Sequence, residues 1–220
     1  MSEVVLLQQS VMAADEKYAL SVRNDLKRKG ILFINMIGSP GCGKTTLLEE
    51  TAKHGKFRMA VIEGDIETSR DAERLSALGV NSYQINTHGG CHLEAHVIER
   101  VIKEMPLDDV DVLFVENVGN LVCPAEFDLG EDFKTAVLST PEGADKPLKY
   151  PMLFANSLVV VLTKTDLLPY VRFDMQLFRK DISSINPVAP VYEVDLINGN
   201  GLGAWLGFIA QKIEEKRKSI

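Results

Sequence analysis

Short apolar runs separated by longer amphipathic segments dominate the hydrophobic pattern of this chain. The runs are rich in β-branched residues and occupy residues 31–38, 57–65, 81–87, 110–119, 157–166 and 188–196. Because they are continuously apolar rather than alternating, they predict strands buried on both faces of a parallel sheet. Helix-length segments lie between them, at residues 44–55, 69–79, 91–105, 172–186 and 203–220. This alternation predicts an α/β fold, with a mostly parallel sheet and helices on both faces.

Two further stretches complete the pattern. Residues 1–29 carry apolar positions at helical spacing and end in a basic turn before Gly30, which predicts an N-terminal helical extension. Residues 139–151 hold three prolines and a glycine. That composition predicts an exposed segment placed for binding. We find no internal repeat and no low-complexity linker, so residues 1–220 are expected to form a single domain.

Charge and cysteine content narrow the class of protein. The formal net charge of -7 argues against a broad nucleic-acid footprint, which needs a basic face. Three cysteines are too few for a disulfide framework and fit a reducing compartment. The first residues lack the features of a signal peptide, and the apolar runs are too short to span a membrane. We therefore expect a cytoplasmic protein.

A phosphate-binding loop follows the first predicted strand. Residues 38–45 read GSPGCGKT, which matches the Walker A pattern, and a predicted helix follows them. Backbone N–H groups of such a loop form a concave donor surface for phosphate oxygens, while its lysine reaches the β and γ phosphates and its threonine ligates Mg²⁺. A chance glycine-rich turn is the alternative, and the flanking elements argue against it. The predicted nucleotide-binding residues are Gly38, Gly41, Cys42 (a small residue filling a tight turn), Gly43, Lys44, Thr45 and Thr46.

Two further strand ends carry carboxylates that suit this chemistry. Residues 110–119 form a Walker B-like strand ending in Glu116, and Gly119 lies where a backbone N–H senses the γ phosphate. Asp65 ends another strand and is expected to face the magnesium ion or the attacking water. Ligands gather at the carboxyl edge of a parallel sheet, although a simply solvated acid is the alternative for each carboxylate. We expect Lys44, Asp65 and Glu116 to be catalytic, with Thr45, Asp65 and Glu116 serving Mg²⁺ directly or through water.

Base recognition is predicted at residues 163–166, which read TKTD. The guanine-binding pattern is Asn-Lys-x-Asp, in which the aspartate accepts from the base and the lysine stem lies over it. Lys164 and Asp166 match, whereas Thr163 replaces the asparagine. Asp166 would be left without donors beside adenine, which is a costly mismatch, so GTP is favoured over ATP.

Cys91, His92 and Cys123 are candidates for a second metal site. Cys91 and His92 open a predicted helix, where the helix dipole would stabilise a thiolate. Cys123 lies shortly after Gly119, where a change of nucleotide would move it. Two thiols and an imidazole suit Zn²⁺ or Ni²⁺ rather than Mg²⁺. From spacing alone, small buried cysteines and a surface histidine remain an open alternative.

Several uncommon motifs in order resemble one family, the hydrogenase-maturation nickel-insertion GTPases. The likeness runs from about residue 16 to the C-terminus and is carried by GSPGCGKTTLLE, EGDIETSRDAERL, GGCHLEAH, ENVGNLVCP, EGADKPLKYP and LTKTDLLPY. The resemblance implies a P-loop GTPase fold of the class that includes signal-recognition and MinD-like proteins. It also implies slow hydrolysis of GTP with Mg²⁺, and a metal site at Cys91, His92 and Cys123.

The same resemblance implies a metallochaperone that assists nickel insertion into [NiFe]-hydrogenase. Its implied partners are a second copy of the chain, joined in a GTP-promoted homodimer, a zinc-containing nickel chaperone and the hydrogenase large subunit. The first thirty residues lack the Cys-x-x-Cys-Gly-Cys site or histidine-rich tract of many members. Another protein is therefore expected to supply the nickel.

Three alternatives remain at this stage. A urease-accessory nickel GTPase is the nearest, but its metal motif is Cys-Pro-His, and the DKPLKYP segment fits the hydrogenase branch better. A P-loop small-molecule kinase with an incidental Cys-His pair would transfer phosphate to a metabolite rather than to water. A metal buffer without enzymatic activity would have no use for an intact phosphate loop.

Overall fold

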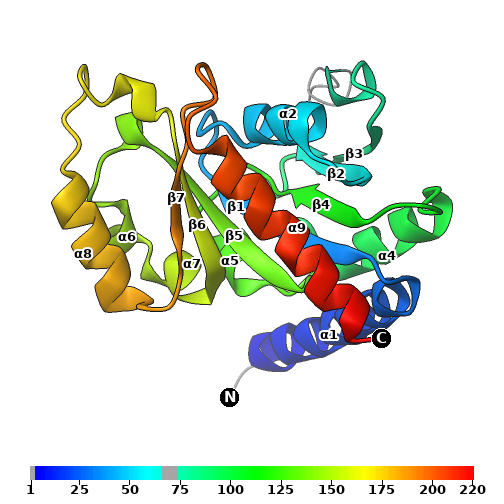
Figure 1. Ribbon diagram of the computed structural model, residues 1–220. Coiled ribbons are helices and arrows are strands. Elements are labelled where there is room, and N and C mark those ends of the chain that lie inside the picture. Colours follow the sequence, from blue (N-terminus) through cyan, green and yellow to red (C-terminus); the bar gives the residue numbers. More distant parts are fainter. Residues whose placement is uncertain (1–2, 66–73) are drawn as a thin grey trace.

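The computed structural model in Figure 1 is a central sheet with helices on both faces. The structure describes the backbone of residues 3–65 and 74–220 and the side chains of residues 15–64 and 74–220. Within these ranges seven strands pair in the order β3-β2-β4-β1-β5-β6-β7, and every pair is parallel. The predicted α/β fold is confirmed. The strands are β1 (Leu32–Gly38), β2 (Met59–Asp65), β3 (Asn81–Asn86), β4 (Val112–Glu116), β5 (Phe133–Ser139), β6 (Ser157–Thr163) and β7 (Val191–Glu193).

Side chains along each central strand alternate between two cores, one on each face of the sheet. On β1, Ile34 packs into one core and Phe33 into the other, as the pleat requires. The first core lies beneath α2 (Lys44–His54) and α9 (Leu202–Lys218), where buried Trp205 donates its indole N–H to Thr51 Oγ1 at 3.0 Å. The opposite face is covered by α1 (Glu3–Lys29), α4 (Ala95–Glu104), α5 (Cys123–Glu126), α6 (Lys146–Lys149), α7 (Pro151–Asn156) and α8 (Met175–Ile185).

The sequence pattern did not indicate β5, although this strand lies between β1 and β6 in the middle of the sheet. Lys134 and Thr135 interrupt its apolar run near the start. Lys134 Nζ donates to the carbonyl of Ala125 at 3.1 Å and lies 3.5 Å from a Glu131 carboxylate oxygen. The Lys134 charge hides this strand in the hydrophobic pattern. In the folded chain these tertiary contacts stabilise that charge.

The prediction of an exposed loop at residues 139–151 is wrong in part. The segment forms a 3-10 helix, η1 (Thr140–Glu142), and then α6. Thr140 and Pro147 are buried, while Leu148 is 58% exposed. The prolines occupy the first turns of these short helices, where a missing N–H costs nothing.

Other boundaries also differ from the pattern. The helix predicted over residues 91–105 begins only at Ala95, so Cys91 and His92 precede it. β3 is half exposed because it forms an edge of the sheet. The helix predicted over residues 69–79 is helical at residues 74–76, and its first part lies outside the described residues.

The C-terminal half of α1 belongs to the core. Ala19, Val22 and Leu26 are each 1% exposed, and the helix packs against α4 and Gly130. Gly130 has a φ of +90°, and a Cβ there would lie 2.4 Å from the Ala19 carbonyl oxygen. No helix in the described part of the chain is long and apolar enough to cross a membrane.

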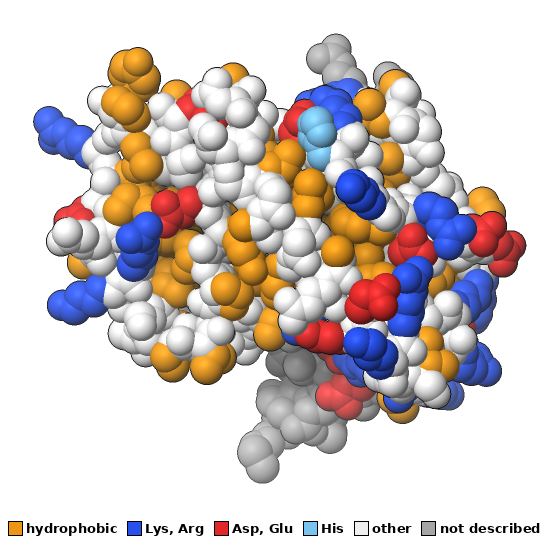
Figure 2. Space-filling model, viewed as in Figure 1, with side chains coloured by type: hydrophobic (Ala, Val, Ile, Leu, Met, Phe, Trp, Pro, Cys, Tyr) orange, Lys and Arg blue, Asp and Glu red, His pale blue; other side chains and the backbone are white. Residues whose placement is uncertain are grey.

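On the face shown in Figure 2, apolar side chains are visible along the region that α9 crosses. Basic and acidic side chains are interspersed near the end of α9. Here Arg217 and Arg58 both contact the Asp111 carboxylate, Arg217 at 2.8 Å and Arg58 at 3.0 Å. Positive and negative side chains therefore neutralise one another at this end of the face.

The burial of α1 predicts that its second half contributes to the stability of the whole domain. Leu26→Ala should lower the free energy of unfolding by about 2–4 kcal/mol, because it leaves a cavity in the core. Leu20→Ala on the same helix is the matched control, since Leu20 is 54% exposed, and should change it by less than about 0.5 kcal/mol. Urea unfolding measures both. Equal effects would contradict the packing of α1 described here.

Candidate functional site

A cleft of about 410 Å³ opens at the carboxyl edge of the sheet. Ligands bind at this edge in open α/β folds. The cleft brings together most of the residues predicted to bind nucleotide, while Gly38, Cys42 and Asp166 lie outside its lining. Of the predicted residues, those that line it are Gly41, Gly43, Lys44, Thr45, Thr46, Glu116, Gly119 and Lys164.

The phosphate loop has the local geometry that its sequence predicts. Gly41 and Gly43 have φ values of +71° and +98°, which favour glycine. A Cβ on Gly38 would lie 2.4 Å from the Val137 carbonyl oxygen and 2.6 Å from Cys42 Sγ, so only glycine fits there. Cys42 is fully buried and packs inside the turn. Burial raises the pKa of its thiol to about 11.

Lys44, Thr45 and Glu116 meet at the floor of the cleft. Lys44 Nζ donates to the carbonyls of Gly38 and Ser39 at 3.2 and 3.3 Å and lies 4.0 Å from Glu116 Oε1. The Thr45 hydroxyl donates to the same carboxylate oxygen at 2.9 Å. A hydroxyl and a carboxylate at this separation are suitable oxygen ligands for Mg²⁺, one directly and one through water.

Gly119 closes the cleft against the phosphate loop. A Cβ on this residue would lie 2.6 Å from Pro40 Cγ and 2.9 Å from Pro40 N. The backbone after β4 therefore approaches the loop as closely as glycine allows.

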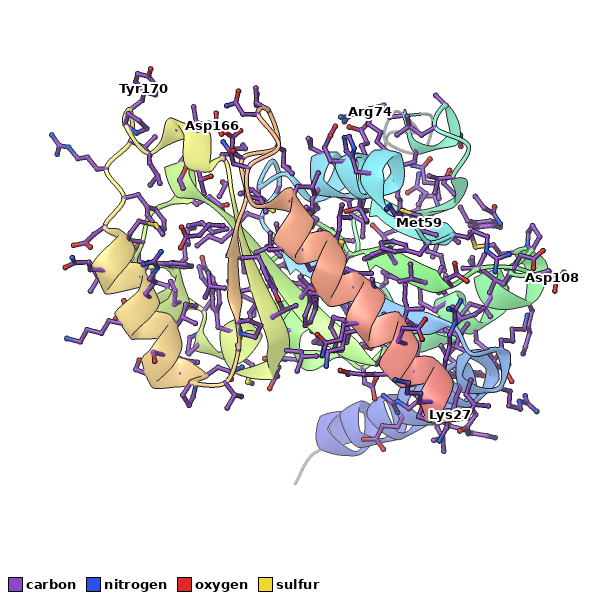
Figure 3. The ribbon with its side chains drawn as sticks, in the orientation of Figure 1. Lys27, Met59, Arg74, Asp108, Asp166 and Tyr170 are labelled. Carbon is purple, nitrogen blue, oxygen red and sulfur yellow. The ribbon has the colours of Figure 1, made fainter. Side chains whose placement is uncertain are left out.

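The residues predicted to recognise the base follow β6, near the phosphate loop. Lys164 has a φ of +55°, and its ammonium donates to the Gly41 carbonyl at 2.6 Å, so its stem crosses the loop. Asp166 is the middle residue of a 3-10 helix, η2 (Thr165–Leu167), and is half-buried. Figure 3 shows Asp166 and Arg74 at the same edge of the molecule.

Thr163 acts on the phosphate loop, which its sequence pattern did not indicate. Its side chain is fully buried, and its hydroxyl donates to the Cys42 carbonyl. Gly43 packs against it, with a Cβ position 3.4 Å from Thr163 Oγ1. Thr163 stands where the guanine-binding pattern has an asparagine that contacts the base. In this chain its side chain instead connects the phosphate loop to β6.

The cleft is also lined by two charged residues, Glu63 and Arg74, that the sequence analysis did not identify. Glu63 is 3% exposed and pairs in register with Glu116 across β2 and β4. Its acidic position inside an apolar run was a usable signal. Arg74 forms an ion pair with Glu49 of α2 at 2.7 Å, a contact between distant segments that carries no sequence signal. Asp65 ends β2, but its side chain lies outside the described residues.

Cys91, His92 and Cys123 form a cluster of possible metal ligands beside this cleft. One ligand atom from each residue lies within 4.8 Å of the others. Cys91 Sγ and His92 Nδ1 are 3.4 Å apart. Bond lengths of about 2.3 Å to sulfur and 2.0–2.1 Å to nitrogen give a spacing of about 3.6 Å in a tetrahedron and about 3.1 Å in a square. The separation of Cys91 and His92 lies between these values, so these two donors are spaced as they would be around Zn²⁺ or Ni²⁺.

Aromatic stacking orients the imidazole of this cluster. The rings of His92 and Phe127 are stacked, with centroids 3.8 Å apart and an angle of 18°. His96 lies within α4, 3.0 Å from Glu94, whereas His92 precedes the helix, so the two histidines do not share a helix face. Because α4 begins after Cys91, the predicted stabilisation of its thiolate by a helix dipole is wrong. A hydrogen bond with the Cys123 thiol raises the pKa of Cys91.

The contact between Thr163 and the phosphate loop predicts that Thr163→Val weakens GDP binding. Loss of a buried hydrogen bond costs on the order of 1–2 kcal/mol, or roughly tenfold in affinity. Thr135→Val is the matched control, because the buried Thr135 hydroxyl has no hydrogen-bond partner among the described residues. Titration with a fluorescent GDP analogue measures both. Affinities equal to that of the unchanged chain in both variants would refute this role of Thr163.

The three thiols differ in solvent exposure, which predicts different rates of alkylation. Cys91 is exposed and Cys123 half-buried, so both should be alkylated by iodoacetamide in the folded chain. Cys42 should resist alkylation near neutral pH, because it is buried and its raised pKa keeps it protonated. Mass spectrometry of peptides, with urea-unfolded chain as control, counts the modified sites. Labelling of Cys42 at the rate of the unfolded chain would contradict the structure.

Comparison with known proteins agrees with this geometry. Residues 32–193 match the family model "CobW/HypB/UreG, nucleotide-binding domain". The Escherichia coli (strain K12) hydrogenase maturation factor HypB is 44% identical over 95% of this chain and 73% of its own length. HypB from Azotobacter chroococcum is 44% identical over 96% of this chain and 70% of its own length.

Solved structures show the same relationship. A crystal structure of Helicobacter pylori HypB in complex with nickel matches 93% of this chain and 97% of its own, with a TM-score of 0.88 and 36% identity. The signal recognition particle receptor FtsY of Elizabethkingia anophelis matches with a TM-score of 0.54 and 15% identity over 81% of this chain and 65% of its own, which shows the shared P-loop GTPase fold alone. The chain therefore belongs to the CobW/HypB/UreG family, among the hydrogenase maturation factors HypB.

Proposed function

We propose that the chain is a GTP-hydrolysing metallochaperone that binds Ni²⁺, or Zn²⁺, and assists nickel insertion into [NiFe]-hydrogenase. The observation that carries this proposal is the short segment from Glu116 to Cys123. One end of the segment lies in the nucleotide cleft, and the other supplies a thiol to the metal-ligand cluster. A change at the γ phosphate therefore has a short covalent path to the bound metal.

Each group of residues in the cleft has its own proposed role in the hydrolysis of GTP to GDP and phosphate. Backbone N–H groups of the loop, with Lys44, hold the phosphates and stabilise charge as a water oxygen bonds to the γ phosphorus and the bond to the β-phosphate oxygen breaks. Thr45 and Glu116 would hold Mg²⁺, which neutralises the phosphate charge. Asp65 is proposed to orient the attacking water. Lys164 and Asp166 are proposed to select guanine. Turnover is expected to be slow without an activating partner.

Three donors from one chain leave a coordination position open for a ligand from elsewhere. We propose that GTP promotes a homodimer in which two copies of Cys91, His92 and Cys123 approach one another. Hydrolysis then relaxes the segment around Gly119 and releases the metal to the hydrogenase large subunit. A zinc-containing chaperone is the proposed source of nickel. The nickel complex of the Helicobacter pylori relative supports nickel as the cargo.

Urease maturation is a second candidate function. Relatives from Helicobacter hepaticus and Helicobacter pylori, 38% and 35% identical, are named hydrogenase/urease maturation factors. The same switch would then serve a second nickel enzyme. Family membership leaves no support for a small-molecule kinase.

The proposal predicts that Ni²⁺ affinity depends on the bound nucleotide. Competition with a chromophoric chelator should give dissociation constants that differ at least tenfold, or about 1.4 kcal/mol, between GDP and a non-hydrolysable GTP analogue with Mg²⁺. Cys123→Ala should weaken binding in both states because it removes one ligand. His88→Ala is the control, since exposed His88 lies outside the cluster. Equal affinities in both nucleotide states, or binding that survives Cys123→Ala unchanged, would overturn the coupling.

A further inference from the structure

Asn117 lies directly between the nucleotide cleft and the metal-ligand cluster. It follows Glu116 at the end of β4, lines the cleft and is 2% exposed. Its side-chain oxygen accepts hydrogen bonds from two backbone N–H groups, that of Val118 at 3.0 Å and that of Leu93 at 3.3 Å. Val118 also lines the cleft, whereas Leu93 is the residue after His92. One carboxamide therefore joins the segment at the nucleotide to the segment that carries two metal ligands.

The orientation of this carboxamide is fixed from its other side. Asn117 Nδ2 donates to Asn35 Oδ1 at 3.1 Å, and Asn35 Nδ2 in turn donates to Glu131 Oε1 at 3.4 Å. Because Leu93 and Val118 present donors, the atom facing them must be the oxygen. A buried polar group that satisfies its bonds in this way has little freedom to rotate.

Two neighbouring contacts make the connection between the segments stiff. The Leu93 side chain is buried against Gly64 of β2, which lines the cleft, and a Cβ on Gly64 would lie 2.8 Å from Leu93 Cδ1. Asn120 Nδ2 donates to the Cys91 carbonyl at 3.2 Å. The backbone from Cys91 to Leu93 is thus held to residues 117–120 at two points.

We propose that Asn117 is the positioning residue that transmits the state of the nucleotide cleft to Cys91 and His92. The inference rests on the proposed nucleotide-dependent metal binding and assigns its structural cause. When the backbone at Asn117 and Val118 moves with the γ phosphate, the shared oxygen carries Leu93 N, and with it His92, in the same direction. Cys123 moves through the chain itself. The distances between Cys123 and the two ligands Cys91 and His92 therefore depend on the nucleotide state.

A purely structural asparagine would behave differently. Its removal would lower stability but would leave the ratio of metal affinities in the two nucleotide states unchanged, because the ligands and the cleft would still be present. That ratio is the quantity that separates the two roles.

The test compares Ni²⁺ dissociation constants in the GDP state and in the state with a non-hydrolysable GTP analogue. Asn117→Ala removes the oxygen and the Nδ2 donor. Asn117→Asp keeps an oxygen acceptor for Leu93 and Val118. Asn186→Ala is the matched control, because Asn186 Nδ2 also bonds buried backbone carbonyls, those of Phe154 and Ser157, away from both sites.

We expect the ratio in Asn117→Ala to fall within about twofold of one, a residual coupling below about 0.5 kcal/mol. Asn117→Asp, which keeps the acceptor but loses the donor to Asn35 Oδ1, should retain more of the ratio than Asn117→Ala, and Asn186→Ala should retain all of it. If Asn117→Ala keeps the full ratio, the inference is wrong while the proposed function stands. If the unchanged chain itself shows a ratio of one, the proposed function fails and the inference fails with it.

Hydrogen exchange on the unchanged chain provides a test that needs no variant. The amides of Leu93 and Val118 share one acceptor, so their protection should change together between the GDP and GTP-analogue states. A change at Val118 with none at Leu93 would contradict transmission through Asn117. This readout stays valid if Asn117→Ala does not fold.

Discussion

β1 and β4 pair in parallel register, with Leu32 opposite Val112 and Met36 opposite Glu116, and both sites depend on this pairing. Parallel strands end at the same edge of a sheet, so the phosphate loop after β1 and the segment after β4 leave the core side by side. The register sets Glu116 beside Thr45. Because the chain then continues to Cys123, the same pairing also places the metal-ligand cluster next to the nucleotide cleft.

The segments of the two sites are in direct van der Waals contact at two glycines. Gly119 lies against Pro40 of the phosphate loop, and Gly64 lies against Leu93 beside the metal ligands. A side chain at either glycine would separate the segments. Packed contacts of this kind transmit displacements because protein interiors have little free volume. The HypB fold of this chain thus places the nucleotide cleft and the metal-ligand cluster a few residues apart on one edge of the sheet.

The sequence predicted those parts of the structure that depend on local pattern. The phosphate loop, the buried strands and the cluster of Cys91, His92 and Cys123 follow from residue type, spacing and family resemblance. It did not predict β5, whose Lys134 is compensated only by tertiary contacts. Nor did it predict the start of α4 or the contacts of Thr163 and Asn117. Thr163 bonds Cys42, and Asn117 bonds Leu93 and Asn35. These partners lie far away in the chain, and no periodicity records such pairs.

We propose that GTP hydrolysis releases the metal, and a single-turnover measurement tests this step. Chain loaded with Ni²⁺ and GTP is mixed with Mg²⁺ and a chromophoric chelator, and phosphate release and nickel transfer are followed together. The two rates should coincide, and Lys44→Ala, which is expected not to hydrolyse GTP, should retain its nickel. Nickel transfer at the same rate in Lys44→Ala, or well before phosphate release, would contradict this proposal.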